Sequence, residues 1–107
     1  MTDDALTRLR RLIGGPRDGA LLRVSLAHEL LTQDDTNTAV DELRTALTFD
    51  PDYSAAWKLL GKTLADTGDV TAASEAYRHG IAAAVKRGDK QAEKEMSVFL
   101  RRLTSRG

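Results

Sequence analysis

The feature that most constrains the fold is a spacing of 34 residues between similar positions in the two halves of the chain. A period of this length is typical of helical hairpins, each of which leaves an apolar face that only a neighbouring hairpin can cover. Small side chains are expected where two helices approach closely, and larger ones where hairpins meet. The recurring pairs are Leu26 and Leu60, Ala27 and Gly61, Leu30 and Leu64, Ala39 and Ala73, and Leu43 and Tyr77.

Helical periodicity divides the chain into about six expected helices, which are separated by glycine, proline or aspartate. No stretch alternates apolar and polar residues with a period of two, so no strand is expected. The predicted fold class is therefore all-α, a stack of antiparallel helical hairpins. We expect one domain over residues 1–107, made of an N-terminal helix at 2–13, a first repeat at 20–53, a second repeat at 54–87 and a capping helix at 89–105.

The second copy of the repeat resembles the tetratricopeptide repeat family, whose pattern is Trp-x2-Leu-Gly-x2-Tyr, then Ala-x3-Phe, then Pro. It matches that pattern at Trp57, Leu60, Gly61, Leu64, Ala73 and Tyr77. The first copy supplies the closing Pro51, but Arg23 stands where the family has tryptophan. In the second copy Gly80 replaces a small alanine, which is expected to weaken that helix by about 0.5–1 kcal/mol. The resemblance covers Ala20 to Ala84 and implies an α-α superhelix.

Composition excludes several classes of protein. The chain has no cysteine, so disulfides, thiolate nucleophiles and Cys-based zinc sites are ruled out. The longest apolar run, residues 81–85, is too short to span a bilayer, and the N-terminus does not have the pattern of a secretory signal. We therefore expect a cytoplasmic protein without a membrane partner.

Catalytic motifs are also absent from the sequence. The glycine-rich segment from Gly14 to Gly19 lacks the lysine and the serine or threonine of a phosphate-binding loop. His28 and His79 have no second ligand or catalytic partner at a recognisable spacing. The sequence therefore predicts neither an enzyme nor a metal site, and it implies no cofactor.

The resemblance implies a concave groove, lined by the first helix of each hairpin, that holds an extended peptide or a helix of a partner protein. Lys58 and Lys62 lie four residues apart on one helical face, where both could receive a carboxylate of the partner. Carried over by motif position, the predicted groove residues are Leu21, Val24, His28 and Leu31 from the first repeat, Ala55, Lys58, Lys62 and Asp66 from the second, and Ala92 and Met96 from the capping helix.

Two arrangements are open for the apolar side chains Leu21, Val24 and Leu31. They form an exposed patch if the groove is open, and they belong to the core if the N-terminal helix folds over them. The second arrangement is favoured, because that helix must also bury apolar residues of its own, such as Leu9 and Ile13.

The leading functional hypothesis is a protein–protein interaction scaffold that binds a protein or peptide. The first alternative is a weakly self-associating structural subunit, because residues 1–53 carry 6 basic and 10 acidic side chains, a balance of −4, whereas residues 54–107 carry 10 and 6, a balance of +4. A nucleic-acid binder is the weakest alternative, since acidic residues dilute the basic cluster and aromatic residues that could stack on bases are missing. That cluster comprises Lys86, Arg87, Lys90, Lys94, Arg101, Arg102 and Arg106.

Overall fold

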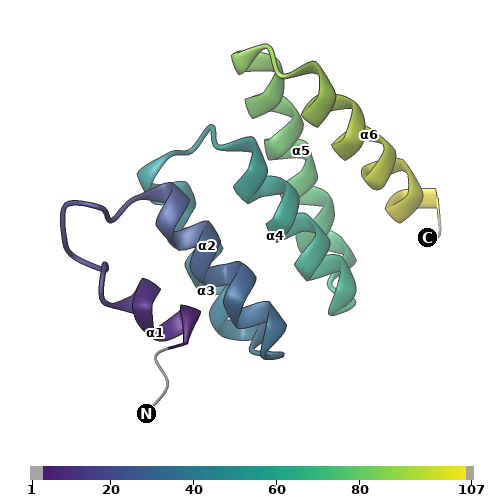
Figure 1. Ribbon diagram of the computed structural model, residues 1–107. Coiled ribbons are helices and arrows are strands. Elements are labelled where there is room, and N and C mark those ends of the chain that lie inside the picture. Colours follow the sequence, from purple (N-terminus) through teal and green to yellow (C-terminus); the bar gives the residue numbers. More distant parts are fainter. Residues whose placement is uncertain (1–3, 106–107) are drawn as a thin grey trace. The chain divides into compact units, whose positions relative to one another are not determined.

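The computed structural model describes residues 4–105, which form six helices and no strand, so the all-α prediction is confirmed. By their internal contacts the residues fall into two compact units, Met1–Asp50 and Pro51–Gly107. Apart from the short first helix, consecutive helices within each unit run antiparallel (Figure 1). The helices are α1 (Ala5–Arg10), α2 (Ala20–Thr32), α3 (Thr36–Phe49), α4 (Ser54–Asp66), α5 (Val70–Arg87) and α6 (Lys90–Ser105).

Aspartate side chains start four of these helices by accepting a hydrogen bond from a backbone N–H of the first turn. The caps of α3 and α5, Asp35 and Asp69, are 34 residues apart, so the repeat extends to its turns. The residues just before them, Asp34 and Gly68, both have positive φ, 58° and 88°. The two turns therefore share one backbone geometry, and the sequence repeat reflects this.

The first unit contains α1, α2 and α3, with α1 against α2 and α2 paired with α3. Ala27 and Ala39 have no exposed surface, as expected for small residues at a close helix approach. The N-terminal helix ends at Arg10, three residues before the predicted end of the range 2–13. Its first residue is Ala5, and residues 2 and 3 of the predicted range lie outside the described residues. Leu21 is 69% exposed, so the expectation that this helix covers it is wrong. A helix of six residues is too short to cover the whole apolar surface of α2.

Arg23 replaces the family's tryptophan with a network of polar contacts. Its Nε and Nη2 atoms donate to the two carboxylate oxygens of Asp18, both at 3.0 Å, and Nη1 donates to Glu42 at 2.9 Å. The guanidinium carbon also lies 5.9 Å from the ring centroid of Phe49. Hydrogen bonds from Arg23 and from the backbone N–H of Gly14 hold the pKa of Asp18 well below its ordinary range. The first repeat therefore has an ionic anchor where the second has an aromatic one.

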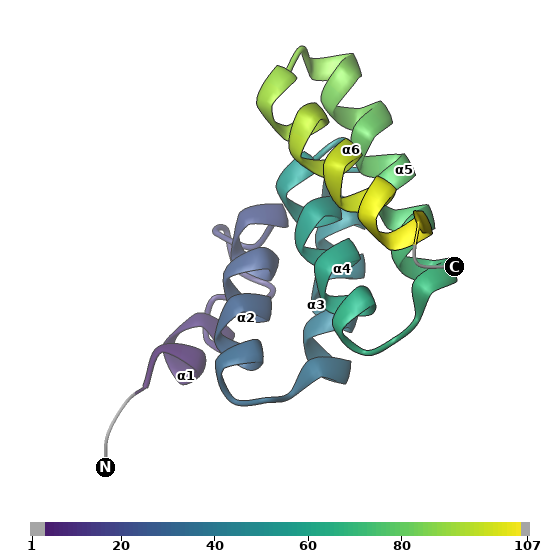
Figure 2. The same cartoon turned by 90° about the vertical axis from the view of Figure 1, so that its right-hand side faces the viewer.

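The second unit contains α4, α5 and α6, and α6 lies alongside α5 (Figure 2). Tyr77 is buried here, and a Cβ atom added to Gly61 would lie 2.5 Å from its ring, so only glycine permits this approach of α4 to α5. The aromatic anchor of this unit is Trp57, whose ring stacks on His79 with centroids 4.9 Å apart. Its Nε1 donates to the carbonyl of Pro51 at 2.7 Å.

Gly80 has a packing role that the sequence did not indicate. It is buried, and an added Cβ would lie 2.7 Å from Cβ of Trp57 and would overlap Sδ of Met96. The expectation that glycine only weakens α5 at this position is therefore incomplete, because alanine does not fit between the neighbouring helices. Gly80 allows both α4 and α6 to pack closely on α5.

Candidate functional site

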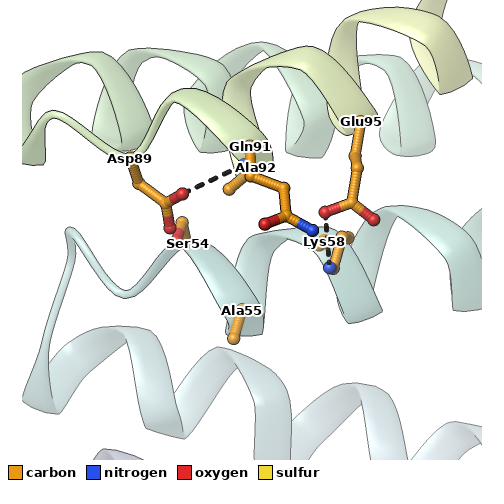
Figure 3. Close-up of a pocket in the computed structure, with 7 residues that line it drawn as sticks. All are labelled: Ser54, Ala55, Lys58, Asp89, Gln91, Ala92 and Glu95. Carbon is orange, nitrogen blue, oxygen red and sulfur yellow. Dashed lines mark hydrogen bonds and ion pairs between the residues drawn. The ribbon is translucent and has the colours of Figure 1, made fainter.

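A cavity of about 250 Å³ opens between the first turns of α4 and α6 in the second unit (Figure 3). Ser54, Ala55 and Lys58 reach it from α4. Asp89 is held at its edge because its Oδ1 atom accepts the N–H of Ala92 at 3.1 Å and so starts α6. The residues that line the cavity are Ser54, Ala55, Lys58, Asp89, Gln91, Ala92 and Glu95.

An ion pair bridges α4 and α6 in this cavity. Nζ of Lys58 lies 3.4 Å from a carboxylate oxygen of Glu95, and the two side chains are 38% and 40% exposed. Lys58 was expected to receive a carboxylate from a partner, and in the free chain Glu95 supplies one. An ion pair this exposed contributes only about 0–1 kcal/mol, so a partner can separate it at little cost.

The charges of the cavity favour a ligand group that is basic or that donates hydrogen bonds. One cation, Lys58, lies among two carboxylates, Asp89 and Glu95, and the remaining polar groups are the hydroxyl of Ser54 and the amide of Gln91. A basic or hydrogen-bond-donating group of a partner therefore finds acceptors on α6, while a carboxylate must first displace Glu95 from Lys58.

The other residues predicted in the second unit have different surroundings. Lys62 and Asp66 are strongly exposed and pair with each other on α4 at 3.9 Å. Ala92 is 8% exposed and contributes a small part of the cavity wall. Met96 is fully buried in the core cluster with Tyr77, so its predicted place in an open groove is wrong. It fills the space that Gly80 leaves on α5, which turns that side of α6 into core.

The predicted groove residues of the first unit all lie on α2 and differ in burial. Leu21 and His28 are exposed, Leu31 is half-buried and Val24 is only 6% exposed. Val24 therefore offers almost no side-chain surface to a partner, whereas Leu21 and His28 are accessible.

Sequence reasoning missed Ser54, Asp89, Gln91 and Glu95 as cavity residues. Ala92 lies one repeat period of 34 residues after Lys58. Residues three positions before and after Ala92 share its helical face. Those residues are Asp89 and Glu95, so the period combined with helical spacing was a sufficient signal for both.

Two other kinds of site are absent from residues 4–105. No helix among them is long and apolar enough to cross a membrane. They also contain no group of three His, Cys, Asp or Glu side chains that could hold a metal ion.

Comparisons with known proteins give consistent results over most of the chain. The family model described as tetratricopeptide repeat matches residues 30–93. TPR repeat-containing protein PA0015 of Pseudomonas aeruginosa is 45% identical over 95 residues, which are 89% of this chain and 90% of that protein.

Solved structures agree with these matches. The solution structure of protein BPP2914 from Bordetella parapertussis has a TM-score of 0.82 and 43% identity, and the match covers 99% of this chain and 91% of that one. The crystal structure of a tetratricopeptide repeat domain protein from Salinibacter ruber has a TM-score of 0.76 over 82% of this chain and 98% of that one. Its identity is 24%, so it supports the fold alone.

Proposed function

Because the chain belongs to the tetratricopeptide repeat family, we propose that it is a protein–protein interaction module that binds a peptide segment of a partner in the cavity between α4 and α6. Proteins of this fold typically mediate protein–protein interaction. The observation that carries the proposal is the cavity itself, because three of the predicted groove residues, Ala55, Lys58 and Ala92, line it together.

The bound segment is an extended peptide that brings a basic or amide group into the cavity. Asp89 and Glu95 accept hydrogen bonds from this group, and Lys58 moves from Glu95 to a carbonyl or carboxylate of the peptide. The exposure of the ion pair supports this exchange, because partly solvated charges lose little when they change partners. The module acts by binding.

A cavity-filling substitution tests the proposal. Ala55 is exposed and lines the cavity, so Ala55→Trp blocks it, while Ala82→Trp adds the same side chain to an exposed position of α5 that does not line it. Each variant is used to capture proteins from a lysate of the source organism, and captured proteins are quantified against the wild-type chain by mass spectrometry.

We expect the partners of the wild-type chain to fall by at least about tenfold with Ala55→Trp and to be kept with Ala82→Trp. Circular dichroism confirms that both variants are folded. Partners that both variants retain equally would refute binding in the cavity.

A further inference from the structure

A second cleft, of about 430 Å³, lies along α5 and α6 in the second unit. On α6 its lining residues follow helical spacing, i, i+3, i+4 and i+7, and are about half a turn around the helix from those of the first cavity. The cleft is lined by Arg78 and Ile81 of α5 and by Ser97, Leu100, Arg101 and Thr104 of α6.

Two lining residues of this cleft have repeat equivalents that are more deeply buried. The residues one period before Ile81 and Ser97 are Leu47 and Thr63, which are 9% and 3% exposed. Ile81 and Ser97 themselves are only half-buried. Each hairpin of such a repeat leaves an apolar face for a neighbour, so the open cleft has the form of a position for one more helix.

Charge determines which helix fits. Its apolar lining residues are Ile81 and Leu100, and each helix adds one arginine, Arg78 from α5 and Arg101 from α6. No carboxylate lines the cleft, and neither guanidinium has a hydrogen-bond or ion-pair partner among the residues that the structure describes. An occupant that buries Ile81 and Leu100 must bring acidic groups to these two arginines or leave them without a partner.

We propose that this cleft binds an amphipathic helix of a partner protein, whose apolar stripe packs on Ile81 and Leu100 and whose flanking acidic residues pair with Arg78 and Arg101. The lining of α6 from Ser97 to Thr104 extends over about 10 Å, which matches two turns of a bound helix. This surface is separate from the cavity between α4 and α6, so each can be tested without the other.

The test uses a labelled synthetic helix of about four turns that carries leucines at i, i+4 and i+7 with glutamates beside them. A second peptide has lysines in place of the glutamates, and a third has serines in place of the leucines. Binding to the full chain is measured by fluorescence anisotropy at about 0.1 M salt. Only the glutamate-flanked peptide is expected to bind the wild-type chain.

The variant Arg78→Glu, Arg101→Glu should weaken this binding by at least about tenfold and should gain affinity for the lysine-flanked peptide. Its matched control, Arg17→Glu, Arg44→Glu, makes the same charge change on exposed arginines of the first unit, which do not line the cleft, and should alter affinity by no more than about twofold.

Three results would overturn the proposal. The first is a failure of the glutamate-flanked peptide to bind saturably, or equal binding of the third peptide, which has serines in place of the leucines. The second is a single-stranded oligonucleotide that binds through the same two arginines and displaces the peptide. The third is a dimer of this chain, detected by sedimentation, that Arg78→Glu, Arg101→Glu abolishes.

Discussion

The substitution Gly80→Ala has two opposite effects at one buried position: it raises helix propensity and it crowds the core. Alanine in a helix interior is favoured over glycine by about 0.5–1 kcal/mol, so propensity alone predicts a more stable protein. In the structure the added methyl group would lie 2.7 Å from Cβ of Trp57, an atom fixed to the backbone of α4. On its other side is Met96, which is fully buried and so has little room to move.

Overpacking a core by one such group costs about 1–3 kcal/mol. After the gain in helix propensity, the free energy of unfolding should fall by about 0.5–2 kcal/mol. For a chain of 107 residues each kcal/mol corresponds to about 4 °C in Tm, so Tm should fall by roughly 2–8 °C.

The assay is urea unfolding followed by far-ultraviolet circular dichroism. The control, Ala82→Gly, exchanges the same two residues at an exposed position of α5 and should cost about 0.5–1 kcal/mol, the propensity effect alone. If Gly80→Ala stabilises the chain by as much as Ala82→Gly destabilises it, the close approach at Gly80 does not limit packing and the argument is refuted.

Three further predictions follow from contacts described above. Gly61→Ala should destabilise the chain by about 0.5–2 kcal/mol in the same urea assay, because overpacking against the ring of Tyr77 outweighs the gain in helix propensity, and a neutral result would show that the ring can move away. Lys58→Ala should change stability by less than about 1 kcal/mol, since its ion pair is exposed; a larger loss would mean that this pair holds α6 in place. Folding lowers the pKa of Asp18, chiefly through the hydrogen bonds from Arg23, so the unfolded chain binds the proton more readily than the folded chain. This carboxylate therefore contributes stability above its ordinary pKa of 3.8, and that contribution is lost as the pH falls through and below 3.8. Asp18→Asn should flatten the decline in stability between about pH 5 and 3, and an unchanged slope in urea titrations would contradict this.

The repeat period and helical spacing predicted the helices and their order because both follow from the sequence pattern without knowledge of the packing. Position in a repeat does not determine how deeply a side chain is buried, which is why Met96 was predicted in an open groove and lies in the core. The same limit applied to Gly80, whose importance comes from side chains on two other helices.

Ion pairs were the harder part of the site to predict. Lys58 and Glu95 are 37 residues apart in sequence, and their contact depends on the packing of α6. Arg23 illustrates the same point in the first unit, because a departure from the family pattern proved to be the centre of a network with Asp18 and Glu42. A mismatch to a motif can thus be a replacement of one kind of anchor by another.

Trp57 gives the molecule a built-in optical reporter. It is the only tryptophan of the chain, and its ring stacks on His79 inside the unit Pro51–Gly107. Indole emission therefore follows the loss of structure in that unit alone, whereas circular dichroism follows the helices of both. Coincident transitions by the two signals would show that the ionic and the aromatic repeat melt as one cooperative body, and separated transitions would give each its own stability.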